Sequence, residues 1–116
     1  MTLPNDEWRV LLAKRFPKID PAEKGLKWKL LKNQLAIGKS VTGTVVAKAH
    51  FGVWLDIGAE FPAFLLIVSI RDLTPEKYRS DEWCPLGDSV VATVGGFNEE
   101  AHTVCVWQIN NTLAAN

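Results

Sequence analysis

The sequence is poor in the residues that build metal centres, disulfide frameworks and membrane spans. Its 116 residues include two cysteines, two histidines and one methionine. Neither Cys84 nor Cys105 has a second cysteine or a histidine at metal-ligand spacing. No apolar run is long enough to span a membrane, and the N-terminus lacks the basic-then-apolar pattern of a signal peptide. We therefore expect a cytoplasmic chain with reduced thiols, no membrane partner and no metal.

Catalytic patterns are missing as well. His50 and His102 have no paired nucleophile, because the serines fall in ordinary turn or strand settings. Gly95-Gly96 is too short for a phosphate-binding loop and opens no helix. The sequence therefore predicts a binding protein and not an enzyme, with no cofactor.

Charge is balanced overall and uneven along the chain. Thirteen Lys and Arg residues face thirteen Asp and Glu residues. Residues 1–48 hold ten basic and four acidic residues, a net +6, and residues 49–116 hold three and nine, a net −6. Such asymmetry can leave a positive face for an acidic partner on a neutral molecule. A solvated, lysine-rich helix explains the same counts, and charge alone favours this reading.

The first 36 residues carry two helix patterns. Asn5 can cap a helix that Pro17 ends, and its apolar side consists of Trp8, Leu11, Leu12 and Phe16. A second helix starts at Asp20-Pro21-Ala22-Glu23, with an aspartate cap, proline in the first turn and glutamate three residues after the cap. Its buried stripe is predicted to contain Trp28, Leu31 and Leu35.

After Gly38 the apolar period changes from helical to two. Five short strands are predicted near 41–48, 51–57, 63–68, 89–94 and 102–108, with a long excursion over 69–87. Five short strands lose their exposed edges when they close, so we predict a mainly β, five-stranded OB-fold barrel with two N-terminal α-helices. The expected division is a helical extension over 1–36, the barrel over 37–109 and a loose tail over 110–116.

The stretch "HFGVWLDIG" (residues 50–58) raises the question of function. Alternation points Val53 and Leu55 inward and Trp54 outward, while Phe51 shares the inward parity. A bulge at Gly52 would turn Phe51 to the surface beside Trp54. Two exposed rings side by side would suit the stacking of nucleobases. The alternative is that Phe51 belongs to the core and that the N-terminal helices cover Trp54.

A wider pattern supports the first reading. The run "IGKSVTGTVVAKAHFGVWLDIGAEFPAFLLIVS", followed by "PLGDSVVATV" and "TVCVWQ", resembles the S-one RNA-binding domain over about residues 37–108. This resemblance implies an OB barrel that binds single-stranded or structured RNA, with Phe51 and Trp54 as stacking residues. It also places Leu66, Asn98 and His102 at site positions where the family has a histidine, an aspartate and an arginine. Lys48 and His50, on the outward parity of the preceding strand, complete the predicted RNA-binding set.

The departures from the family pattern support a second hypothesis. Phe64 shares its parity with Leu66, so the outer surface would be largely apolar, and exposed apolar patches often bind proteins. An adaptor that binds a protein partner through this face is the alternative function. Of the other residues, we expect Trp28, Trp107 and Cys105 in the core and Trp83 as a lid packed on the barrel.

Overall fold

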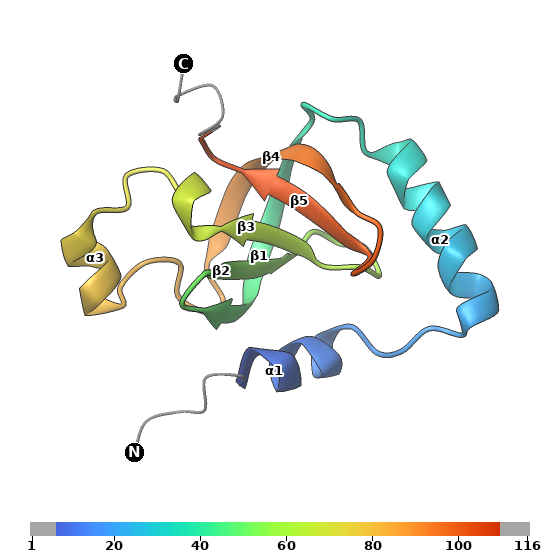
Figure 1. Cartoon of the computed structure of the whole chain (residues 1–116), viewed down its shortest axis with the longest axis horizontal. Coiled ribbons are helices and arrows are strands. Elements are labelled where there is room, and N and C mark those ends of the chain that lie inside the picture. The colour runs from blue at the N-terminus through green and yellow to red at the C-terminus, as the bar shows by residue number, and fades with distance from the viewer. Residues whose placement is uncertain (1–6, 110–116) are drawn as a thin grey trace.

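The protein forms a small closed barrel flanked by helices (Figure 1). The computed structural model describes residues 7–109, so the predicted cap at Asn5 and the tail over 110–116 lie outside the described residues. The elements in chain order are α1 (Glu7–Arg15), α2 (Pro21–Gln34), β1 (Ser40–Ala49), β2 (Gly52–Asp56), β3 (Ala63–Leu66), the short 3-10 helix η1 (Ile67–Ser69), α3 (Pro75–Ser80), β4 (Ser89–Asn98) and β5 (Thr103–Trp107). The predicted mainly β barrel and its two N-terminal helices are confirmed.

Strand β1 is the element that closes the barrel. The strand order is β1-β2-β3-β5-β4. One half of β1 pairs with β4, and the other half pairs with β2. The pairing of β1 with β2 shifts register between Val45 and Ala47. Such a bulge bends a strand and increases its twist, which lets one strand serve two sheet partners.

Inward-facing aliphatic side chains fill the barrel. Val53, Leu55, Leu65, Val94 and Val104 have no exposed surface. Each of these side chains contributes about 1.5–3 kcal/mol by leaving water. The predicted alternation of β2 is confirmed for its inward positions.

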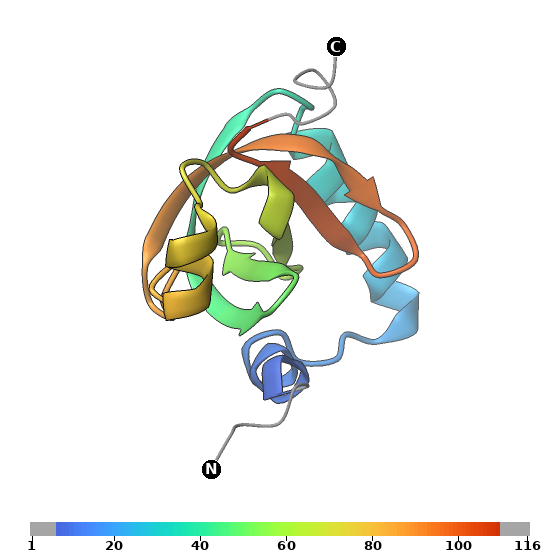
Figure 2. The same ribbon diagram turned by 60° about the vertical axis from the view of Figure 1, so that its left-hand side comes forward.

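Helix α2 buries side chains against the barrel, whereas α1 buries none. The Oδ1 atom of Asp20 accepts a hydrogen bond from the Ala22 amide at 3.2 Å, as the capping pattern predicted. Trp28 is 3% exposed and lies edge-on to Phe61 and Phe97, with ring centroids at 5.1 and 5.8 Å. In α1 no residue is buried. Figure 2 shows α1 on the outside of the barrel, separated from α2 by a linker.

Two core predictions for β5 are wrong. Cys105 is exposed and Trp107 is half-buried, because Val104 and Val106 take the inward positions. All residues from Val104 to Trp107 are apolar, so the sequence did not show which of them face inward. Trp83 is buried against the barrel, as predicted for a lid. Within residues 7–109, no helix combines the length and the apolar character that crossing a membrane requires.

Candidate nucleic-acid interface

Three aromatic side chains gather on the outer surface of β2 and β3, and we call Phe51, Trp54 and Phe64 the aromatic face. The Phe51 and Trp54 ring centroids are 5.6 Å apart with an interplanar angle of 84°. The Phe64 ring lies 4.9 Å from Trp54 and 5.9 Å from Phe51. The prediction that Phe51 and Trp54 share one outer surface is therefore confirmed.

The backbone reaches this arrangement by a turn and not by a bulge at Gly52. Ala49 pairs with Gly52 and Lys48 with Val53, so His50 and Phe51 form the tight connection between β1 and β2. Phe51 lies outside the strand, and strand parity does not apply to its side chain. The predicted bulge at Gly52 is wrong, because the register shift lies in β1 instead.

Gly52 lets the aromatic face form for a different reason. A Cβ atom at this position would lie 2.5 Å from the Leu65 carbonyl oxygen and 2.6 Å from Cζ of Phe64. The first of these neighbours is backbone of the paired strand, which cannot move aside without breaking the sheet. The missing side chain thus makes room for the Phe64 ring over the β2–β3 pair.

Helix α1 covers the aromatic face. Trp8 stacks on Trp54 with ring centroids 4.3 Å apart and an angle of 13° between the planes, and it meets the Phe51 edge at 5.8 Å. Leu11 and Leu12 pack against the same cluster. Trp54 is consequently only 7% exposed. The expectation that its ring faces water is wrong, and the alternative that an N-terminal helix covers it is confirmed.

An ion pair joins the other end of α1 to β2. Nε of Arg15 donates to Oδ2 of Asp56 at 2.6 Å, and a second guanidinium nitrogen lies 2.5 Å from the same oxygen. The second carboxylate oxygen of Asp56 accepts a hydrogen bond from the Gly58 amide at 2.8 Å. Trp8 and Arg15, near opposite ends of the helix, therefore both contact β2.

The two predicted basic residues of this surface, Lys48 and His50, have different contacts. Lys48 donates to the Trp83 carbonyl at 2.5 Å, pairs with Asp81 at 2.9 Å and lies over the Trp83 ring at 4.2 Å. Its ammonium group thus holds the segment after α3 in place. His50 is exposed, and its ring lies 5.1 Å from Phe51 at the edge of the aromatic face.

The other three predicted site residues divide between two locations. Leu66 is 43% exposed on β3 and pairs with Gly52, next to the aromatic face. Asn98 and His102 lie at the β4–β5 hairpin. There Oδ1 of Asn98 accepts bonds from the amides of Glu100 and Ala101, and the His102 ring lies 5.3 Å from Trp28 of α2. The structure brings together Phe51, Trp54, His50 and Leu66, and it places Asn98 and His102 at the hairpin.

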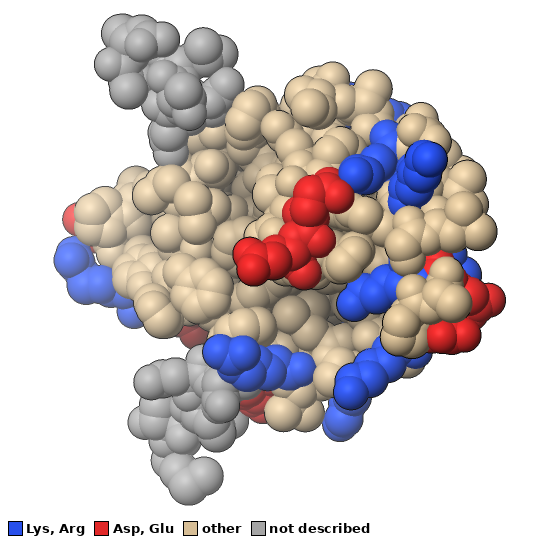
Figure 3. Space-filling model, turned by 45° about the vertical axis from the view of Figure 1, so that its right-hand side comes forward, with Lys and Arg blue, Asp and Glu red and all other residues tan. Residues whose placement is uncertain are grey.

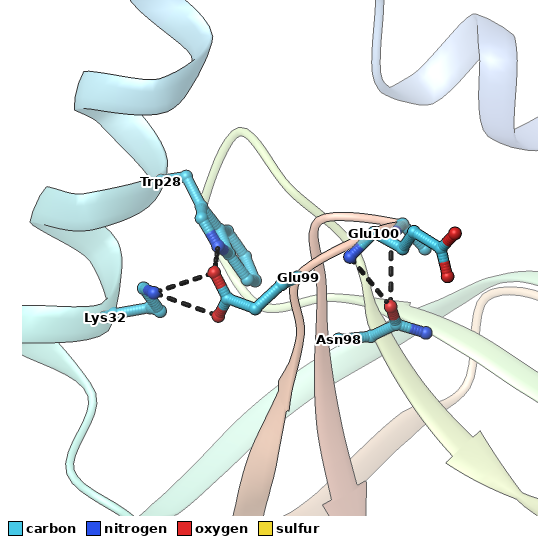
Figure 4. Close-up of polar contacts among 6 residues, drawn as sticks. Trp28, Lys32, Asn98, Glu99 and Glu100 are labelled. Atoms are coloured by element: carbon cyan, nitrogen blue, oxygen red, sulfur yellow. Dashed lines mark hydrogen bonds and ion pairs between the residues drawn. The ribbon is translucent and has the colours of Figure 1, made fainter.

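Sequence reasoning missed the role of Glu99. Its carboxylate accepts a hydrogen bond from Nε1 of Trp28 at 3.1 Å and pairs with Nζ of Lys32 at 2.9 Å (Figure 4). The Lys32 hydrogen bond, and after it the Trp28 hydrogen bond, lower the pKa of Glu99 from its ordinary value of 4.5. This residue joins the hairpin to α2, and its place in a polar turn gave no signal of that contact.

Several basic side chains of the N-terminal half form ion pairs with acidic side chains that follow in the chain. Four cations of the N-terminal half pair with acids that follow them in the chain, namely Arg15–Asp56, Lys27–Glu60, Lys32–Glu99 and Lys48–Asp81. Figure 3 shows basic side chains on this side of the molecule with acidic side chains beside and between them. The described lysines that make no ion pair include Lys14, Lys18, Lys24 and Lys29. The positive face is therefore smaller than the charge count suggests.

An open groove runs beside the aromatic face, between α1 and α3. Its volume is about 710 Å³, and its lining includes the acidic Glu7 and Asp81 as well as Trp8, Lys48, His50, Tyr78 and Arg79. Basic and aromatic side chains thus continue from the edge of the aromatic face toward α3.

Comparison with known proteins identifies the fold. No protein-family model matches the chain, and no curated protein matches it in sequence. Among solved structures, GSP13 from Bacillus subtilis matches at 22% identity and a TM-score of 0.54, over 71% of this chain and 61% of that protein.

Two further structures also match, one over a small share of its own chain and the other over nearly all of it. RNase R from Mycoplasma genitalium, solved in complex with ribose methylated single-stranded RNA, matches at 20% identity and a TM-score of 0.54 over 76% of this chain and 15% of that protein. MJ1198 from Methanocaldococcus jannaschii matches at 16% identity and a TM-score of 0.53 over 65% of this chain and 93% of that protein. The barrel is an OB fold. The similarity agrees, at the level of the fold, with the resemblance to S-one type domains.

Proposed function

We propose that the protein is an RNA-binding module whose aromatic face stacks the bases of single-stranded RNA. One observation carries the proposal: three aromatic rings stand together on the outside of a closed OB barrel, in a cluster separate from the one that fills the barrel. The fold adds support, because RNase R, which shares it, was solved with single-stranded RNA bound.

The proposed roles follow from the positions of the side chains. Phe51 and Trp54 stack bases, which requires Trp8 to leave Trp54. Leu66 borders them, and His50 contacts phosphate or base edges beside Phe51. The groove between α1 and α3 offers Arg79 and Tyr78 to the continuing strand. Lys48, Asn98 and His102 remain predicted contacts, and their present bonds would have to be shared with the RNA.

Stacking alone gives weak binding. Each stacked base contributes about 1–3 kcal/mol, so two bases contribute about 2–6 kcal/mol. Before the losses of association are subtracted, this corresponds to a Kd between about 30 mM and 40 μM, so stacking alone binds more weakly still. Contacts from cations to phosphate are required for tighter binding, and these contacts make the affinity depend on salt.

A titration of a fluorescently labelled single-stranded oligonucleotide at 50 and 200 mM salt tests the proposal. We expect Phe51→Ala and Trp54→Ala to weaken binding at least about fivefold, because each removes a stacking contact. Val91→Ala, at an exposed aliphatic position of β4, is the matched control and should bind as the unmodified protein does. Failure to bind at 50 mM salt, or equal affinities for all four proteins, would contradict the proposal.

One observation favours the second candidate, a protein adaptor. The aromatic face already accepts an apolar helix surface in the form of Trp8, Leu11 and Leu12. A partner helix with similar side chains would fit the same place. Absence of RNA binding at low salt, together with capture of a protein partner that Trp54→Ala no longer captures, would favour this function.

A further inference from the structure

The contact between Trp8 and Trp54 has the geometry of a base stacked on an indole ring. The two ring planes are nearly parallel, 13° apart, at a centroid distance of 4.3 Å. The Arg9 guanidinium lies over the Trp8 ring at 4.4 Å. Trp8 therefore occupies the position on Trp54 that a nucleobase would take in the proposed function.

Helix α1 lies against the barrel but buries none of its own residues, whereas α2 buries Trp28 and Leu31. Helix α1 has nine residues, none of them buried. Isolated helices shorter than about 12–15 residues are marginal in water, so α1 depends on its contacts with the barrel. Its ion pair joins an Arg15 side chain that is 53% exposed to an Asp56 side chain that is 17% exposed, and a pair with one partner in water typically contributes about 1 kcal/mol or less.

Helix α1 can leave the barrel surface and still remain tethered to the rest of the protein. Residues 16–20 link it to α2, and α2 stays in place because Trp28 and Leu31 are buried. A released α1 would remain close to the face it covered. Release of α1 breaks the ion pair between Arg15 and Asp56, while Asp56 keeps its hydrogen bond from the Gly58 amide.

We propose that α1 is a displaceable cover of the aromatic face, with Trp8 holding the place of a base that single-stranded RNA takes by competition. This inference rests on the proposed function. It adds that the closed form binds RNA more weakly than the open form. The apparent affinity of the protein is then reduced by the fraction of molecules in which the face is open.

Substitutions that loosen the cover test this inference in the full chain. Trp8→Ser and Arg15→Gln should each bind a single-stranded oligonucleotide about three- to tenfold more tightly, because they raise the open fraction. Val10→Ser changes a side chain that is 56% exposed on the same helix and should leave the affinity unchanged. Equal or weaker binding by both Trp8→Ser and Arg15→Gln would overturn the cover, and weaker binding would mean that α1 belongs to the RNA site.

Trypsin cleavage supplies a second readout of the same event. We expect RNA to accelerate cleavage after Lys14 and Arg15, because both lie in the displaced helix. Protection of these sites, or unchanged cleavage while RNA is bound, would overturn the cover and leave the proposed function intact. If neither the unmodified protein nor Trp8→Ser binds RNA, the proposed function fails and the inference fails with it.

Discussion

At the scale of single residues, Gly52 controls the shape of the aromatic face. A side chain at this position would press against the Leu65 carbonyl oxygen and the Phe64 ring. Both neighbours belong to β3, so the strain would act on the β2–β3 pair. The face and the barrel thus depend on the same missing Cβ atom.

We expect Gly52→Ala to lower the free energy of unfolding by about 1–3 kcal/mol, as overpacking in a sheet does. Urea unfolding followed by tryptophan fluorescence measures the change. Gly96→Ala is the control, because a Cβ atom at Gly96 would meet no atom within 4 Å. Equal destabilisation by the two substitutions would show that loss of glycine flexibility, and not the close contact, determines the effect.

Glu99 gives the stability a dependence on pH. The hydrogen bonds from Lys32 and Trp28 lower the pKa of its carboxyl from 4.5 in the folded protein. A lowered folded-state pKa stabilises the protein above the unfolded-state pKa, and this contribution is lost as the pH falls through the folded-state value.

The urea midpoint should therefore fall less between pH 6 and pH 3 in Glu99→Gln than in the unmodified protein. Glu100→Gln is the matched control, since the Glu100 side chain points away from Trp28 and Lys32 (Figure 4). An identical pH profile for Glu99→Gln and the unmodified protein would show that these bonds do not contribute to stability.

At the scale of elements, the two N-terminal helices differ in what holds them. The sequence predicted both helices, and it predicted the buried stripe of α2, because strong capping residues and a regular apolar stripe mark them. The docking position of α1 was not predictable from its own pattern. An apolar helix side indicates that the helix packs on something, and only the tertiary structure shows that Trp8 packs on Trp54.

Trp28 is the residue that fastens α2 to the barrel, and its removal tests that role. Trp28→Ala should lower the free energy of unfolding by about 3–5 kcal/mol, because it leaves a large cavity between Phe61 and Phe97. Leu26→Ala, at a position 63% exposed on the same helix, should change it little. Thermal unfolding by circular dichroism compares the two, and equal losses would contradict the anchoring role.

At the scale of the whole molecule, the opposite charges of the two halves meet in the fold. The N-terminal cations Arg15, Lys27 and Lys32 pair with acids of the barrel, so part of the charge asymmetry is used internally. The charge count raised the possibility of a positive face but could not show this pairing, because partners 33 to 67 residues apart are visible only after folding. The barrel was predictable because period-two strands repeat along the sequence. The turn at His50-Phe51 was not predicted, and the cover of Trp54 was raised only as an alternative, since both depend on register and docking.

The most direct test of the central claim is a map of the RNA-binding surface by NMR. Amide chemical shifts of the isotope-labelled full chain are followed while a single-stranded oligonucleotide is added. We expect shift changes in β2, in β3 and in α1, centred on Trp54 and Phe64, with little change in β4 near Val91. Binding confined to the α3 side of the barrel, or no shift change at low salt, would contradict it.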